Sequence, residues 1–258
     1  MNDGRIITIK SSEDFEKMAI AGAAVASVHD AVRDAAAPGV TTAKLDRIAA
    51  EVLKRHECRP SFLGYHGFPA TICASRNEQI VHGIPDTYRL ADGDVLSIDA
   101  GAIFQGWHGD AAFTMAIGDV PPEVARLIEV TDNALWAGLA KARPGSRLGD
   151  VGSTIEAHAA TEGYGVVREY IGHGIGRQMH EAPNVPNYGK KGRGLKLKVG
   201  MALAIEPMFN LGGAETRLLD DGWTVVTRDG KLSAHFEHTV AVTNDGPLVL
   251  TLPEPKLL

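Results

Sequence analysis

The chain has 258 residues, of which 44% are hydrophobic and 22% are charged. This composition is typical of a soluble globular protein and excludes a disordered or fibrous one. The formal net charge of −6 argues against a general nucleic-acid binder, because proteins that bind many phosphates are usually basic.

Two helices are predicted before residue 60. Ser11 starts the first helix, which has acidic residues in its first turn and ends at the Pro-Gly pair 38–39. Thr41 caps the second helix, whose apolar residues repeat at helical spacing until Pro60 stops it.

The pattern changes to short β-type runs over residues 70–117. The clearest strands are residues 95–103 and 107–117. The Gln-Gly pair at 105–106 lies between them and predicts a hairpin turn.

Helices return after this hairpin. The third helix is predicted to open at the Pro-Pro pair 121–122 and to close at the Pro-Gly pair 144–145. Apolar spacing over residues 148–155 indicates a fourth helix. The strand pattern returns after Gly163 and lasts to about residue 251.

The order of two helices followed by strands therefore occurs twice, and two local patterns repeat with it. Residues 36–39 match residues 142–145, and residues 90–99 match residues 197–206, at nearly the same offset. These matches predict an internal duplication that is joined near residues 118–121. The alternative is that both matches are residue patterns that commonly occur in turns.

Four acidic residues lie on predicted strands or at their ends, and Asp99, Glu206 and Glu237 follow or interrupt apolar strand residues. Asp99 ends one predicted strand and Asp110 lies on the next, so the hairpin places these two carboxylates opposite or diagonal to each other. Glu206 occupies the position in the second half that matches Asp99, and Glu237 lies among β-forming residues. If the sheets of the two halves pack together, four carboxylates converge, and their repulsion requires cations.

A fifth ligand is predicted at His173, because the glycines on both sides of it let the backbone approach a site closely. Four carboxylates and one neutral imidazole carry four negative charges, which two divalent cations would balance. This balance suits a dinuclear site whose ions lie roughly 3.5–4 Å apart and hold a bridging hydroxide. The oxygen-rich, sulfur-free ligand set favours Mn, Fe or Co, and zinc stays open. For any single acid, a solvated turn or an ion pair is the alternative.

The cysteine content and the start of the chain predict a cytoplasmic protein without membrane contact. Cys58 and Cys73 are the only cysteines, and they look like reduced thiols. No apolar run approaches the roughly 18–20 residues that span a bilayer. The first sixteen residues contain four acidic residues and no apolar block, so no signal peptide is expected.

Other catalytic motifs are absent from the sequence. There is no Gly-x-Ser-x-Gly nucleophile elbow, no P-loop and no dinucleotide fingerprint, and no specific nucleic-acid partner is expected. One basic cluster is predicted to be a solvated loop, with contact to the ribosome as the open alternative. It contains Lys190, Lys191, Arg193, Lys196 and Lys198.

Taken together, these residues resemble the methionine aminopeptidases over roughly residues 12–251. The motifs that carry the resemblance are Asn77-Glu78, His82-Gly83-Ile84-Pro85, Trp107-His108-Gly109-Asp110, Gly172-His173-Gly174-Ile175-Gly176, Glu206-Pro207-Met208 and Glu237-His238-Thr239. The chain is most similar to type I, because its second half leaves no room for the helical insertion of type II. It also shows no zinc-finger-type or proline-rich extension before the first helix.

The resemblance implies a pita-bread fold of the α/β (α+β) class in a single catalytic domain, residues 1–258. Two pseudo-symmetric halves, about 12–118 and 119–251, would each contain two helices and antiparallel strands. The implied activity is removal of the initiator methionine from new proteins whose second residue is small, by attack of a hydroxide held by two divalent metal ions. The substrates would be the N-termini of nascent polypeptides, and the enzyme would be a monomer.

The resemblance also assigns roles to the five candidate ligands. Asp99 and Asp110 would bind metal, with Asp110 bridging the two ions. His173 and Glu206 would bind one ion, and Glu237 would bridge both. Glu206 is also the expected proton acceptor for the attacking water.

Two histidines and an apolar pocket complete the implied site. His82 and His180 match family residues that contact the substrate and stabilise the tetrahedral intermediate. The methionine pocket would be lined by Phe62, Tyr65, Phe68, Cys73, Met179 and Trp223. Aromatic and sulfur contacts suit a flexible thioether. Some family members have Cys, Tyr and Phe at positions 62, 68 and 179, so the shape of this pocket is open.

Two other functions are considered. A prolidase or aminopeptidase P would share the five ligands, but these enzymes usually have an extra N-terminal domain, and only about eleven residues precede the first helix here. A metal-free binding module with the same fold would lose ligands, and all five are present.

Overall fold

The computed structural model of this chain describes residues 6–258. The helices are α1 (Ser12–Ala35), α2 (Thr42–Arg55), the short 3₁₀ turn η1 (Tyr65–Gly67), α3 (Pro122–Leu139) and α4 (Leu148–Glu162). The strands are β1 (Arg59–Pro60), β2 (Ile72–Arg76), β3 (Gln79–Val81), β4 (Val95–Phe104), β5 (Trp107–Ala116), β6 (Gly165–Val166), β7 (Gly172–Gly174), β8 (Glu181–Val185), β9 (Ala202–Ile205), β10 (Met208–Asn210), β11 (Thr216–Leu218), β12 (Val225–Thr227), β13 (Ser233–His235), β14 (Glu237–Thr243), β15 (Gly246–Val249) and β16 (Lys256–Leu257).

The helix starts follow the predicted caps, whereas the helix ends differ from the prediction. The Ser11 side chain accepts a hydrogen bond from the Asp14 N–H, and the Asp14 carboxylate accepts one from the Ser11 N–H, which closes a capping box. Helix α1 ends at Ala35, before the predicted Pro38, and Ala36 is already extended with ψ of 113°. Pro38 disfavours the helical conformation at Ala37, so the helix cannot resume there.

The predicted ends of the second and third helices are wrong by about five residues each. Helix α2 stops at Arg55, because Glu57 adopts a left-handed conformation with φ of 55° and residues 59–60 pair with β4 as strand β1. Helix α3 stops at Leu139, and residues 140–142 continue as tighter i to i+3 turns before Pro144.

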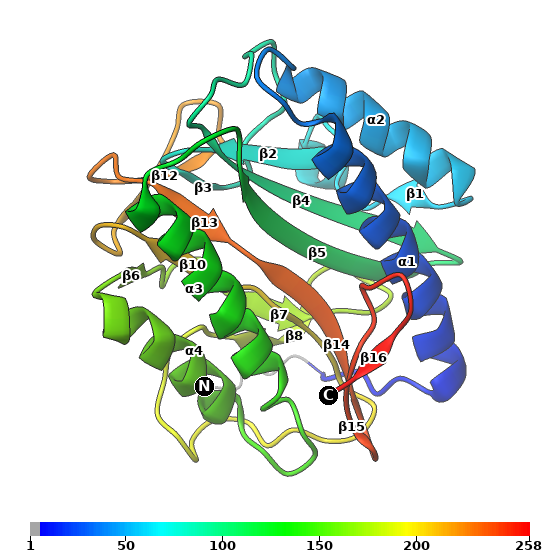
Figure 1. The fold of residues 1–258 in the computed structure, drawn as a ribbon. Coiled ribbons are helices and arrows are strands. Elements are labelled where there is room, and N and C mark those ends of the chain that lie inside the picture. Colours follow the sequence, from blue (N-terminus) through cyan, green and yellow to red (C-terminus); the bar gives the residue numbers. More distant parts are fainter. Residues whose placement is uncertain (1–5) are drawn as a thin grey trace.

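One ten-stranded sheet forms the centre of the molecule, and four helices pack around it (Figure 1). Its main path has the strand order β1-β4-β5-β14-β9-β7-β8, in which every neighbouring pair is antiparallel. The predicted mixed α/β class with antiparallel strands is therefore confirmed. None of the helices within residues 6–258 is long and apolar enough to cross a membrane.

The predicted hairpin is confirmed in detail as β4 and β5. Gln105 and Gly106 both have positive φ, 49° and 81°, which matches the turn type that connects twisted antiparallel strands. In the register of this hairpin Asp99 lies opposite Ala112, and Asp110 lies opposite Gly101. Asp99 and Asp110 are therefore diagonal neighbours on one face of the sheet.

Helix α1 crosses the other face of this hairpin at very short range. A Cβ atom on Gly109 would lie 2.7 Å from the backbone nitrogen of Gly22 in α1, so position 109 requires glycine. Because side chains alternate along a strand, Asp110 points away from α1. The same alternation on β14 directs His238 toward the helices and Glu237 away from them.

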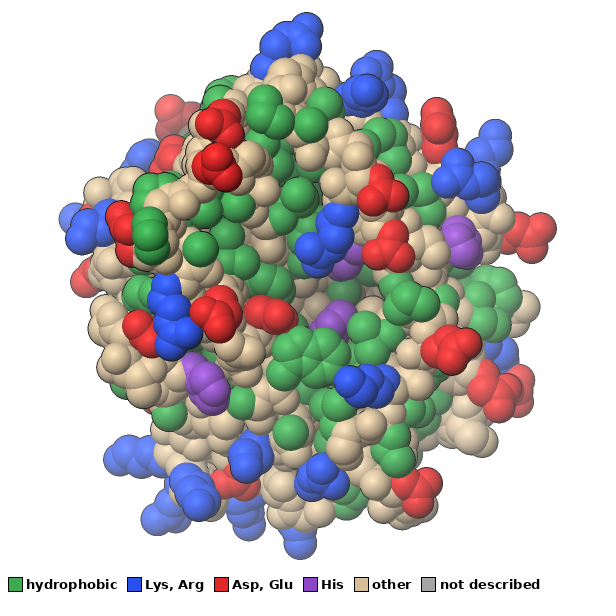
Figure 2. Space-filling view, viewed as in Figure 1, with side chains coloured by type: hydrophobic (Ala, Val, Ile, Leu, Met, Phe, Trp, Pro, Cys, Tyr) green, Lys and Arg blue, Asp and Glu red, His purple; other side chains and the backbone are tan. Residues whose placement is uncertain are grey.

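A hollow of about 410 Å³ lies between α1 and α3 on the face of the sheet that these helices cover. Figure 2 shows it near the centre of the view, with histidine side chains at its floor and charged side chains around its edge. Its lining includes His238 but none of the predicted site residues. The predicted residues lie on the opposite face of the sheet.

Candidate active site

A cavity of about 120 Å³ on the face of the sheet away from α1 contains all of the predicted site residues. The thirteen side chains that line it are Phe62, Tyr65, Phe68, Cys73, His82, Asp99, Asp110, His173, Met179, His180, Glu206, Trp223 and Glu237. The fold therefore brings together every residue that the sequence analysis assigned to the site.

The five candidate ligands come from five consecutive strands of the sheet. Asp99 lies on β4, Asp110 on β5 and Glu237 at the start of β14. Glu206 directly follows β9, and His173 is the central residue of β7. Because these strands are neighbours in that order, residues far apart in the sequence converge on one point.

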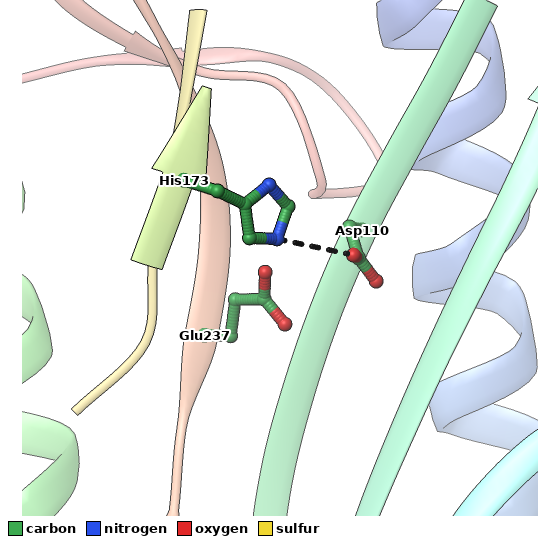
Figure 3. Close-up of side chains that lie close together, drawn as sticks. All are labelled: Asp110, His173 and Glu237. Atoms are coloured by element: carbon green, nitrogen blue, oxygen red, sulfur yellow. Dashed lines mark ion pairs between the residues drawn. The ribbon is translucent and has the colours of Figure 1, made fainter. Parts of the chain in front are cut away.

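His173 lies near two of the carboxylates at distances longer than a hydrogen bond. The Nε2 atom of His173 lies 3.9 Å from Oδ2 of Asp110 and 3.7 Å from Oε1 of Glu206. Ligand atoms of Asp110, His173 and Glu237 all lie within 4.8 Å of one another, and Figure 3 shows their side chains pointing toward a common centre.

The imidazole of His173 is oriented by its own strand. Its Nδ1 atom lies 2.8 Å from the carbonyl oxygen of Gly174, to which it donates a hydrogen bond. This bond leaves the lone pair of Nε2 directed at the carboxylates, as is usual for a metal-binding histidine.

The carboxylates destabilise one another in the absence of cations. Burial, together with the charge of Glu206, raises the pKa of Asp99 to about 7. Burial and the neighbouring carboxylates raise the pKa values of Asp110 and Glu237 well above the ordinary range. One oxygen atom of each of these three groups is buried without a hydrogen-bond partner.

Glu206 differs from the other three acids. Burial alone would raise its pKa, but the nearby imidazoles of His235 and His173 hold the pKa below its ordinary value. The Nε2 atom of His235 lies 3.5 Å from Oε2 of Glu206. Sequence reasoning missed His235, and its only signal was a polar residue in the apolar run before Glu237.

This set of donors fits divalent cations. The buried oxygen atoms without partners are the hard ligands that such ions prefer, and His173 adds one nitrogen. This cluster of buried donors supports divalent metal binding.

The raised pKa values predict how the metal-free protein responds to pH. The folded state holds protons on Asp99, Asp110 and Glu237 that the unfolded chain loses near about pH 4. The free energy of unfolding therefore falls as the pH rises through the pKa of Asp99, about 7, and the raised pKa values of Asp110 and Glu237 act in the same direction. Buried neutral histidines make the free energy of unfolding rise with pH, but only below about pH 6.5, where the histidines of the unfolded chain bind protons.

We therefore expect the Tm of the metal-free protein, measured by calorimetry, to be lower at pH 8 than at pH 7. Asp99→Asn should reduce this difference, and saturating divalent metal should abolish it. A wild-type Tm that rises over the same interval would contradict the assignment of raised pKa values to these carboxyls.

Two histidines face the ligands from loops. The Nδ1 atom of His180 lies 2.8 Å from the hydroxyl oxygen of Tyr65, and its ring centroid lies 4.3 Å from that of His173. Loss of solvent around the ring, and the nearby His173, lower the pKa of His180 to about 4. Burial also lowers the pKa of His82. Both imidazoles are therefore neutral near pH 7, and each has one N–H donor.

Apolar side chains form the remaining wall of the cavity. The rings of Phe62 and Phe68 meet edge to face at 6.5 Å, and Phe68 meets Trp223 at 5.1 Å. Cys73 pairs with Asp99 across β2 and β4, so this wall borders the carboxylates directly. Ile84 also packs against this wall, although the sequence analysis did not include it.

The predicted basic cluster lies in an exposed loop. Lys190, Lys191, Arg193, Lys196 and Lys198 are all exposed, and they lie between β8 and β9 outside any helix or strand.

Comparisons with known proteins agree with this site. The sequence model of metallopeptidase family M24 matches residues 16–244. The methionine aminopeptidase of Clostridium acetobutylicum is 50% identical over 250 residues, covering 96% of this chain and 100% of that protein. Methionine aminopeptidase 1 of Mycobacterium tuberculosis is 50% identical over 255 residues, with 96% of both chains covered.

Solved structures agree with the sequence comparisons. The crystal structure of methionine aminopeptidase from Thermotoga maritima has a TM-score of 0.94 at 42% identity, covering 96% of this chain and 100% of that one. A prolidase from Pyrococcus furiosus, with a TM-score of 0.76 at 22% identity over 94% of this chain and 65% of that one, shares the fold alone. These likenesses confirm the predicted pita-bread fold. The chain therefore belongs to metallopeptidase family M24 and, within that family, to the methionine aminopeptidases.

Proposed function

We propose that this protein removes the N-terminal methionine from newly made proteins whose second residue is small. One observation carries the proposal: an apolar pocket lined by aromatic and sulfur-containing side chains directly borders five metal-ligand side chains from neighbouring strands. Family membership supports hydrolysis at a free N-terminus.

Asp99, Asp110, His173, Glu206 and Glu237 would hold two divalent cations, with Mn, Fe, Co and Zn as candidates. The negative charge of the cluster and its buried oxygen atoms without partners support two ions. When bound, the cations would polarise the scissile carbonyl and make the attacking water more acidic. Asp110 and Glu237, from the two central strands, are the proposed bridging ligands.

Glu206 is the proposed proton acceptor. Its lowered pKa keeps it ionised near neutral pH, so it accepts a proton from the attacking water and returns it to the leaving amine. If the Tyr65 hydroxyl donates to Nδ1 of His180, the other ring nitrogen of His180 is the N–H donor. We assign that N–H to the oxyanion that develops at the scissile carbonyl. His82 would contact the peptide from the other side.

The pocket lined by Phe62, Tyr65, Phe68, Cys73, Met179 and Trp223 would hold the methionine side chain. Its edge-to-face rings and its cysteine and methionine sulfurs suit a linear thioether. The second residue of the substrate must then pass between the His82 and His180 imidazoles, where a large side chain would displace the scissile carbonyl.

Peptides that differ only in the second residue test this function. We expect the metal-loaded protein to release methionine from Met-Ala and Met-Gly peptides. Met-Leu and Met-Lys peptides should react at least about a hundredfold more slowly, because displacing the scissile carbonyl by about 1 Å lowers the rate by about this factor. Free methionine is measured by chromatography. Equal cleavage of Met-Gly and Met-Leu peptides would contradict the steric argument.

Two controls separate the other functions. Cleavage of an Ala-Pro peptide in preference to Met-Ala would indicate a prolidase or aminopeptidase P. Binding of peptides without metal-dependent cleavage would indicate a binding module.

We further propose where and in what form the protein acts in the cell. A single catalytic domain, residues 1–258 with halves 12–118 and 119–251, would act as a monomer on nascent chains in the cytoplasm. The exposed lysines and arginine of residues 190–198 are the surface we assign to contact with the ribosome. Co-sedimentation with ribosomes, compared between the wild type and a variant with these five residues changed to glutamine, tests this contact.

A further inference from the structure

A buried ion pair joins the segment before α1 to the loop that carries His180. The Nζ atom of Lys10 lies 2.8 Å from Oε2 of Glu181, and the two side chains are 2% and 9% exposed. The backbone N–H of Lys10 also donates to the carbonyl oxygen of Gly200 at 2.7 Å, which anchors its segment to the sheet region. A buried ion pair is stable only where further hydrogen bonds satisfy both charges.

The carboxylate of Glu181 closes the turn that contains two site residues. Its Oε1 atom accepts a hydrogen bond from the Gln178 N–H at 3.1 Å, so Met179 and His180 lie between the two bonded residues. The hydroxyl of Thr8 donates to the other oxygen. Burial alone would raise the pKa of Glu181, but the hydrogen bonds from Lys10, Thr8 and Gln178 together hold it below its ordinary value.

The glycine at position 176 lets this ion pair pack directly against the turn. A Cβ atom on Gly176 would lie 2.6 Å from Cε of Lys10 and 2.7 Å from Oε1 of Glu181. The backbone of Gly176 donates to the Gln178 carbonyl at 3.1 Å and accepts from the His108 N–H at 2.9 Å. The last glycine of the Gly-x-Gly-x-Gly motif therefore leaves the space in which the ion pair packs against the turn.

We propose that Lys10 and Glu181 are positioning residues, which fix the turn of residues 176–181 and thereby hold His180 and Met179 in place at the cavity. The inference rests on the proposed function, because it assumes that His180 acts on the substrate. The Tyr65 hydroxyl holds Nδ1 of the His180 ring, and the Glu181 carboxylate holds the backbone at Gln178, two residues before His180.

The test begins with Lys10→Met in the full-length, metal-loaded protein. We expect kcat for a Met-Ala peptide to fall by between about tenfold and a hundredfold, because displacing a catalytic group by nearly 1 Å has an effect of this size. KM should change less than kcat, and the metal content should stay the same. Lys17→Met is the matched control, because Lys17 forms an ion pair of similar length, 2.7 Å to Glu13, on the surface of α1. It should leave kcat unchanged. A normal kcat in Lys10→Met would overturn the proposal.

Two further readouts distinguish positioning from general destabilisation. If Lys10 acts through His180, Lys10→Met should have no additional effect on kcat in a His180→Ala background. Hydrogen–deuterium exchange of the metal-free protein should accelerate at the Gln178 amide and not in β4 or β5. Losses that multiply in the double variant, or unchanged exchange at Gln178, would overturn the proposal.

A second variant covers the case in which Lys10→Met does not fold. Replacing both partners, in Lys10→Met/Glu181→Leu, removes the unpaired charge and commonly preserves stability. We expect this variant to fold and bind metal but to retain the reduced kcat; wild-type kcat would overturn the inference. Failure of the wild type itself to release methionine would instead refute the proposed function.

Discussion

Asp110→Asn and Glu237→Gln are each expected to abolish methionine release and to weaken metal binding. The two residues lie on the adjacent central strands β5 and β14, and each has a ligand atom within 4.8 Å of a ligand atom of His173. Because a neutral amide cannot balance the charge of two cations, either substitution leaves positive charge uncompensated. Metal content after dialysis and kcat for a Met-Ala peptide are the measurements.

The metal-free forms of these variants provide an internal control for folding. Removal of one buried charge relieves the repulsion that raises the pKa values of these carboxyls, so each variant without metal should unfold at a higher temperature than the wild type at pH 8. Asp245→Asn, at an exposed position, should change neither activity nor metal content. Near-normal activity with full metal occupancy in Asp110→Asn would contradict the dinuclear proposal.

His180→Ala is expected to retain metal and to lose turnover. Removal of a donor to a developing oxyanion typically raises the barrier by about 2.7–4 kcal/mol, which lowers kcat by about 10²–10³-fold. The His180 ring is hydrogen-bonded to the Tyr65 hydroxyl and not to the carboxylates. The metal affinity of His180→Ala should therefore stay close to that of the wild type. Isothermal titration with the metal and steady-state kinetics measure the two effects separately.

His56→Ala is a suitable control for this experiment, because His56 is exposed at the end of α2, outside the cavity. It should have wild-type kinetics. Loss of metal in His180→Ala would show that His180 is itself a ligand, and the oxyanion assignment would then be wrong.

Much of the site could be predicted from the sequence, because its ligand residues lie in recognisable local sequence patterns. The two-residue turn of the β4–β5 hairpin sets the strand register, so the sequence could place Asp99 and Asp110 opposite or diagonal to each other, and the structure shows the diagonal arrangement. Charged residues that interrupt apolar strands stand out, because burial of an unpaired charge is unfavourable. The glycines beside His173 were equally visible.

The tertiary structure alone decided which strands are neighbours. The sequence could state only that four carboxylates would meet if the sheets of the two halves packed together. The pairing of β14 with both β5 and β9 brings them together. Helix α2 likewise ends before Pro60, because pairing with β4 draws residues 59–60 into the sheet.

The contacts that support the site residues could not be predicted from local sequence patterns either. His235 beside Glu206, Tyr65 beside His180, and Lys10 beside Glu181 join residues that are 29, 115 and 171 positions apart. Local sequence determines backbone propensity, turn type and the alternation of side chains, all of which act over a few residues. Contacts between distant residues depend on how the whole chain closes, so only the complete fold determined them.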